Sequence, residues 1–182
     1  MTIFRRYTPA ARHTMIRAAL LSLDGGRRVL DEDAVLLALA ETRPFAGQLD
    51  AFTLEPEAIR PGIVAAGDRE LLAGLGIDLD GVRRRMSALV PMDDPSRWHL
   101  RRSPARPLRV TLSGPPGDLP LTSRARKVIE VAAHYGGTAV TGEDLLRGLL
   151  ADARNRSVSL MRRNGVPLRP LAAALGLLPQ AA

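Results

Sequence analysis

Two stretches of the chain, residues 7–40 and 121–150, repeat one pattern of helix starts and apolar positions. At a constant separation of 114 residues, the matched pairs are Thr8 with Thr122, Ala11 with Ala125, Arg12 with Arg126 and Met15 with Ile129. The separation is 110 residues over the second helix expected in each stretch, and a third block joins residues 71–86 to residues 160–175 at a separation of 89. Three ordered blocks indicate an internal duplication, and this duplication constrains the architecture more than any single motif does.

The composition favours helices over sheets. Of the 182 residues, 46% are hydrophobic but only 3% are aromatic, so a core must be built from Leu, Val, Ile, Ala and Met. We therefore predict an all-α fold, an eight-helix pseudo-two-fold bundle of two four-helix repeats. Each repeat alone buries too little surface to be stable, so the two are expected to pack as one domain.

The duplication divides the chain into a first repeat (residues 1–90, with an insertion at 45–67), a linker (91–120) and a second repeat (121–178). Helix-capping signals mark the expected helix starts at Thr8-Pro9, Asp31, Thr122 and Thr141, the last with Asp144 as a capping box. Four further helices are expected near residues 69–75, 80–90, 157–163 and 168–175. The linker is rich in Pro and Arg; its pieces 98–100 and 108–112 alternate enough to form a small hairpin, and a tether without fixed structure is the alternative.

The sequence blocks carry a family resemblance. The matching segments are residues 7–12 and 121–126, which contain Thr and Ala-Arg at common positions, residues 33–40 and 143–150, which are rich in Leu, and residues 75–80 and 164–168, which have a Gly at the second position. In these segments the chain resembles the Clp amino-terminal domain, the double-repeat module at the front of Hsp100 unfoldases such as ClpA and ClpC. No Walker motif of an ATPase module is present in the sequence, so the resemblance implies a stand-alone copy.

The resemblance implies a non-catalytic receptor for peptides or proteins. Domains of this family bind adaptors and substrate segments, ClpC-like members bind phosphorylated arginine, and actinobacterial relatives bind cyclic-peptide antibiotics. A free copy would act as an adaptor, a decoy or a sponge for such ligands in Clp-dependent proteolysis. A Clp ATPase or protease is the other partner that the resemblance implies, and the absence of cysteine fits the reducing cytoplasm.

Two sets of residues match the family's ligand sites. The first set is Asp33 and Glu143, which occupy the positions of the phosphoarginine-binding glutamates, and a carboxylate can accept a guanidinium through paired charge-assisted hydrogen bonds. The alternative is that both are first-turn acids that complement helix dipoles. The second set, at the antibiotic-binding face, is Phe4, Arg12, Leu121, Arg126 and Glu130. For Phe4 the alternative is an apolar staple on the first helix.

The charge of the chain leaves a second class of function open. The net charge is +7 at pH 7, and nearly all of the basic residues are arginine. The alternative function is therefore a basic nucleic-acid-binding protein that uses the Arg-rich linker, with Trp98 stacked on a base. A GC-biased genome explains the scattered arginines better, and Trp98 fits a core edge better. We therefore do not favour nucleic acid as the partner.

The sequence indicates no metal site, no catalytic site and no signal peptide or membrane span. His13, His99 and His134 stand alone without a second ligand at metal spacing, so no metal or other cofactor is expected. No nucleophile and base stand out as a pair, so we do not expect an enzyme. No apolar run predicts a signal peptide or a membrane span.

Overall fold

The computed structural model describes residues 3–47, 49–63, 92–103 and 109–178. Within these ranges the chain forms seven α-helices and one three-stranded antiparallel sheet, so the prediction of an all-α eight-helix bundle is wrong. The helices are α1 (Pro9–Asp24), α2 (Glu32–Thr42), α3 (Pro56–Ile63), α6 (Ser123–Tyr135), α7 (Gly142–Leu150), α8 (Arg156–Arg163) and α9 (Leu168–Ala174). A 3₁₀ turn, η1 (Ile3–Arg6), precedes α1, and a second, η2 (Pro95–Arg97), precedes the sheet. The two helices expected at 69–75 and 80–90 lie outside the described residues.

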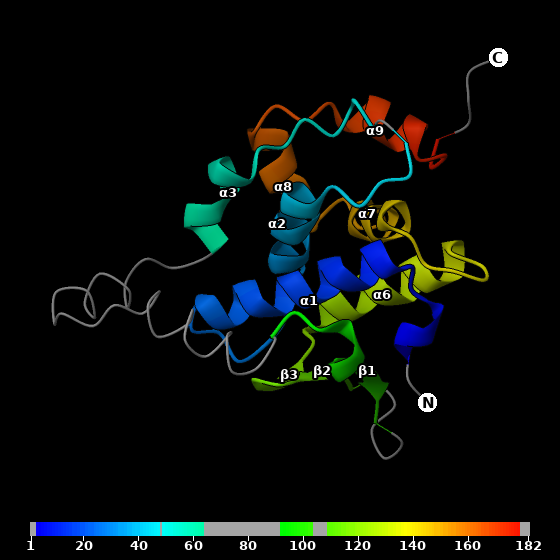
Figure 1. Cartoon of the computed structure of the whole chain (residues 1–182). Coiled ribbons are helices and arrows are strands. Elements are labelled where there is room, and N and C mark those ends of the chain that lie inside the picture. Colours follow the sequence, from blue (N-terminus) through cyan, green and yellow to red (C-terminus); the bar gives the residue numbers. More distant parts are fainter. Residues whose placement is uncertain (1–2, 48, 64–91, 104–108, 179–182) are drawn as a thin grey trace, which may run out of the picture.

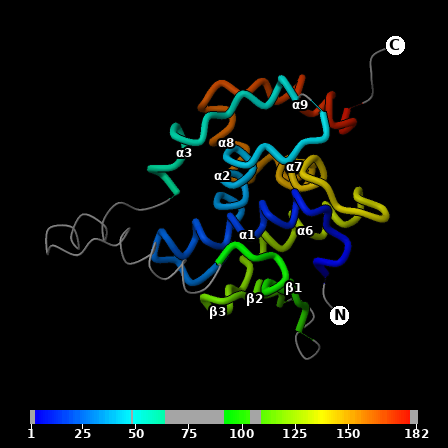
Figure 2. The backbone as a smooth tube through the Cα atoms, in the orientation of Figure 1, coloured from blue at the N-terminus to red at the C-terminus, as the bar shows by residue number. Residues whose placement is uncertain are grey.

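The elements are stacked in layers. Figure 1 shows the sheet at one end of the molecule beneath α1 and α6, with α2 and α7 in the middle and α3, α8 and α9 at the opposite end. The tube in Figure 2 follows the same path and shows the turn η1 close to β1. No described helix is both long enough and apolar enough to cross a membrane.

The four central helices begin at the predicted caps. The Thr8 and Thr122 hydroxyls accept hydrogen bonds from the backbone N–H three residues on, at 3.2 and 3.1 Å. Asp31 does the same for α2 at 2.9 Å, and Thr141 forms the expected capping box with Asp144. These bonds satisfy backbone donors that a helix start leaves free, so local sequence alone fixes where these helices begin.

Two isolated parallel bridges tie the helix pairs together reciprocally. Tyr7, just before α1, bridges to Val140, just before α7, and Leu30, just before α2, bridges to Leu121, just before α6. The Thr8 N–H donates to the Val140 oxygen and the Thr122 N–H to the Leu30 oxygen, both at 2.9 Å. The start of each first helix is thus bonded to the start of the second helix in the other half. Each half therefore depends on the other half for part of the hydrogen bonding at its helix starts.

The sheet is built from the segment expected to be a linker. Strand β1 (His99–Arg102) pairs with β2 (Val110–Gly114), and β2 pairs with β3 (Gly117–Pro120). Leu100, Leu112 and Leu119 lie side by side in register and are all buried. The hairpin expected from residues 98–100 and 108–112 is thus present as β1 and β2, with bounds shifted towards the C-terminus. The third strand was missed because Gly-Asp-Leu-Pro offers only one apolar residue to reveal the alternation.

Trp98 anchors the start of this sheet. Its ring is 1% exposed and its Nε1–H donates to the Met92 carbonyl oxygen at 2.7 Å. The interpretation of Trp98 as a residue at the edge of the core is confirmed. The indole also lies against Gly114, where an added Cβ would be 2.6 Å from its Cε2 atom. The last residue of β2 is therefore a glycine because the ring leaves no room for a side chain.

The insertion after α2 joins the core rather than extending from it. Phe52 and Leu54 are fully buried, and Ile59 and Ile63 on α3 are nearly so. Two arginines hold the end of α3: Arg27 donates to the Ile63 oxygen and Arg156 to the Gly62 oxygen, the latter at 3.3 Å. These guanidinium groups satisfy the carbonyls that a helix end leaves free.

Candidate functional site

A cavity of about 680 Å³ opens between η1, α6 and β1. We call it the N-terminal groove, and its lining consists of Ile3, Arg5, Arg6, Arg102, Ile129, Glu130 and Ala133. Pockets that hold small molecules or short peptide segments commonly have volumes of roughly 300–1,000 Å³. The groove is thus large enough for one or two amino-acid residues of a ligand.

The floor of the groove is fixed by the packing of η1. Phe4 is 2% exposed and meets the Tyr7 ring edge-on, with 5.4 Å between the ring centroids. The Arg12 guanidinium donates to the Phe4 carbonyl oxygen at 2.8 Å and lies 5.9 Å from the centre of its ring. Phe4 and Arg12 therefore hold η1 in place from beneath and do not line the groove. For Phe4 the structure agrees with the alternative role, an apolar anchor next to α1.

Tyr7 lies behind this anchor. Its ring is 4% exposed, and its hydroxyl has no hydrogen-bond partner among the described residues. Burial raises the pKa of the Tyr7 phenol well above its ordinary value, because the charged form would lose its hydration. Tyr7 therefore acts as a neutral packing residue.

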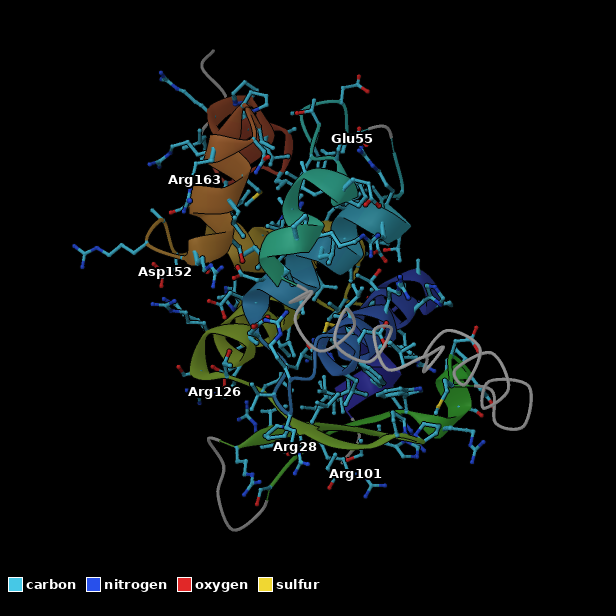
Figure 3. The ribbon with its side chains drawn as sticks, turned by 90° about the vertical axis from the view of Figure 1, so that its left-hand side faces the viewer. Arg28, Glu55, Arg101, Arg126, Asp152 and Arg163 are labelled. Carbon is cyan, nitrogen blue, oxygen red and sulfur yellow. The ribbon has the colours of Figure 1, made fainter. Side chains whose placement is uncertain are left out.

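The acid of the groove is held by two arginines. The Glu130 Oε1 atom lies 2.9 Å from a nitrogen of Arg102 on β1 and 3.6 Å from a nitrogen of Arg126 one turn earlier on α6. Figure 3 shows Arg126 on α6, on the face of the molecule that also presents Arg28 and Arg101. Of the second predicted set, Glu130 lines the groove and Arg126 supports it. Leu121 instead takes part in the bridge to Leu30.

Asp33 is already occupied by partners within the chain. The Asp33 side chain is 5% exposed; one carboxylate oxygen accepts from the Ser157 hydroxyl at 2.9 Å, and the other lies 3.1 Å from Nε of Arg156. Burial raises the pKa of this carboxyl, while the Ser157 hydrogen bond and the Arg156 charge oppose the increase. Asp33 thus joins α2 to the first turn of α8, and a ligand guanidinium would have to displace Arg156.

Glu143 lies in a different environment. One of its oxygens accepts from the Ala46 N–H at 2.6 Å, and the other is buried without a hydrogen-bond partner among the described residues. Its carboxylate therefore connects the first turn of α7 to the loop after α2. Both acids lie in the first turn of their helices, but their contacts are to other segments of the chain, so a helix-dipole role stays a prediction. Neither Asp33 nor Glu143 lines the N-terminal groove.

The Asp33 contact leads to a pH prediction. We expect the free energy of unfolding of the wild type, relative to Asp33→Asn, to increase as pH falls from neutrality towards the ordinary pKa of an aspartate. With its pKa raised in the folded state, the carboxyl binds a proton there at a pH at which the unfolded chain does not, so protonation favours folding. Urea denaturation of both proteins across this pH range measures the difference. A difference that decreases on acidification would show that the Arg156 ion pair dominates.

Most groove residues were not found from the sequence. Ile3, Arg5 and Arg6 are close to Phe4 in the sequence, and Ile129 and Ala133 follow Arg126 at helical spacing. These five residues could therefore have been inferred from residues that were predicted. Arg102 could not be found in this way because it lies on β1, far along the chain from both predicted sets of residues. Among the described residues, no cluster of His, Cys, Asp and Glu has a geometry that could hold a metal ion.

No protein-family model matches the chain, and a search of the curated proteins returns no match. The resemblance to the Clp amino-terminal domain therefore stays a prediction.

Proposed function

We propose that this chain is a non-catalytic peptide-recognition module, of the type that the Clp amino-terminal domain represents, and that it binds peptide or protein segments in the N-terminal groove. The observation that supports this most is the groove itself. It has an apolar floor, it is rimmed by charged side chains, and it contains Glu130, a residue of the face that the resemblance associates with ligands. A pocket of this kind is suited to holding an apolar side chain of a peptide.

The proposal moves the ligand away from Asp33 and Glu143. Since both carboxylates already have partners within the chain, the proposal assigns them to the fold and assigns recognition to the groove. The biological role would be that of an adaptor, a decoy or a sponge in Clp-dependent proteolysis in the cytoplasm. Its ligands would be substrate segments or cyclic-peptide antibiotics that target ClpC.

Calorimetric titration of the full chain tests the proposal. We expect a ClpC-targeting cyclic peptide to bind the wild type and to lose at least about tenfold in affinity on Ala133→Phe, because the larger side chain fills the groove. The matched control is Arg101→Gln. Arg101 is exposed on a strand next to the groove, and Figure 3 shows it at the sheet end of the molecule, but it is not a lining residue.

Three other outcomes would count against the proposal. The first is that no peptide binds. The second is that Ala133→Phe binds the cyclic peptide as tightly as the wild type does. The third is that the chain binds duplex DNA, in a salt-dependent way, and not the peptide. The last would favour the nucleic-acid alternative, since a phosphate partner gives a steep dependence on ionic strength. Circular dichroism of Ala133→Phe would show whether the variant keeps the wild-type fold. Should it unfold, Ala133→Met provides the smaller change.

A further inference from the structure

The charges around the N-terminal groove are unequal. Three guanidinium groups line it, those of Arg5, Arg6 and Arg102, against the single carboxylate of Glu130. Glu130 is compensated twice, by Arg102 and Arg126. The groove therefore presents an excess of positive charge to any ligand, in spite of the acid in its wall.

The three lining arginines differ in what they are free to do. Arg6 donates to the Ala133 oxygen at 3.3 Å and to the Gly137 oxygen, so it holds η1 against the last turn of α6. Arg102 is engaged with Glu130. Arg5 is exposed and has no hydrogen bond or ion pair with the other described residues. Of the lining groups it is the one that can bind a new anion without breaking an existing contact.

The apolar part of the lining consists of Ile3, Ile129 and Ala133. Ile3 and Arg5 belong to the same 3₁₀ turn, so an apolar surface and an unpaired guanidinium lie within one short element. A ligand that fits both must carry an apolar group and an anion close together. A guanidinium binds a carboxylate well because two parallel N–H donors match its two oxygens.

We infer that the N-terminal groove takes the C-terminal residue of a peptide chain, with its apolar side chain on Ile3, Ile129 and Ala133 and its α-carboxylate on Arg5. This inference rests on the proposed function and names the ligand class of that same site. A C-terminal leucine or valine carries both groups on one residue. An internal Asp or Glu uses its side chain for the charge, so a second residue must be ordered to fill the apolar part, which costs further conformational entropy.

The sheet contributes to this selectivity. Without Arg102 the Glu130 carboxylate would keep only the longer contact to Arg126 and would repel an incoming carboxylate more strongly. Arg102 is therefore a positioning and charge-compensating residue, and Arg5 makes the direct contact. Both side chains come from segments outside the duplicated helices.

Fluorescence polarisation with labelled hexapeptides tests the inference on the full chain. Three peptides are based on one sequence. The first ends in leucine with a free carboxylate, and the second ends in leucine amide. The third also ends in the amide but has a glutamate at one internal position. We expect the free acid to bind the wild type about tenfold more tightly than either amide, as one charge-assisted pair provides. In Arg5→Gln this ratio should fall below about threefold, whereas in Arg101→Gln it should be unchanged.

The outcomes separate the inference from the proposed function. Equal binding of the free acid and the plain amide to the wild type would overturn the inference and leave the proposed function standing. Binding of the glutamate peptide as tight as that of the free acid would overturn the choice of a chain terminus. No binding of any peptide, cyclic or linear, would remove both. Arg5→Gln is expected to fold normally because Arg5 is exposed and forms no hydrogen bond or ion pair with the other described residues, and its thermal melt checks this.

Discussion

Replacing Gly148 by alanine is expected to lower the free energy of unfolding by about 2 kcal/mol. Gly148 lies on α7 where this helix crosses α6, and an added Cβ would overlap the carbonyl oxygen of Val128 and come within 3.0 Å of its Cα and carbonyl carbon. These are backbone atoms, so they cannot rotate away. Overpacking of this kind costs about 3 kcal/mol, which exceeds the gain of about 1 kcal/mol that alanine brings to a helix.

Gly62→Ala is the matched control for this substitution. Gly62 also lies in a helix, but among the residues that the structure describes nothing lies within 4 Å of the position that its Cβ would take. We expect Gly62→Ala to be neutral or to raise stability by up to about 1 kcal/mol. Chemical denaturation followed by far-UV circular dichroism compares the two variants. Equal effects on both would mean that α6 and α7 do not cross with their backbones in contact.

The helix starts could be predicted because their causes are local. Thr8, Asp31, Thr122 and Thr141 each cap a helix through a bond to a residue three positions away. Such a bond can be predicted from residues that are close together in the sequence. The reciprocal bridges could not be read in this way, since Tyr7 and Val140 or Leu30 and Leu121 meet only when both helix pairs have formed.

The sheet was predicted only in part, as a hairpin, because its signal is weak and its segment resembles a tether. Each strand has only four or five residues, and the buried face is carried mainly by one leucine per strand. Composition averaged over the whole chain favoured helices and hid these few positions. Single residues such as Leu100, Leu112 and Leu119 become informative only when their register is known.

The candidate site residues could be predicted only in part, for a related reason. Asp33 was singled out by residue type and position, but its partner Ser157 is 124 residues away. Sequence alone cannot say whether such a carboxylate faces solvent or another helix. The same holds for the groove: Glu130 was predicted from the resemblance, whereas its ion-pair partner Arg102 lies on β1, 28 residues earlier in the chain.

Trp98→Ala is expected to lower the free energy of unfolding by about 4 kcal/mol. The substitution leaves a large cavity in place of a ring that is 1% exposed, and it leaves the Met92 carbonyl oxygen without its donor. Because Trp98 directly precedes β1, loosening it should also loosen Arg102 and weaken peptide binding in the N-terminal groove. Trp98 is the only tryptophan of the chain, so circular dichroism rather than fluorescence must follow the variant.

A double-mutant cycle with Gly114 tests the physical cause of this loss. Gly114→Ala alone should be destabilising by about 2 kcal/mol, because its Cβ would meet the Trp98 ring at 2.6 Å from Cε2. In the Trp98→Ala background the ring is gone and the same Cβ enters the cavity, so Gly114→Ala should cost little or restore stability. The coupling between the two sites should then exceed about 1 kcal/mol, whereas additive effects would show that the ring does not lie against β2.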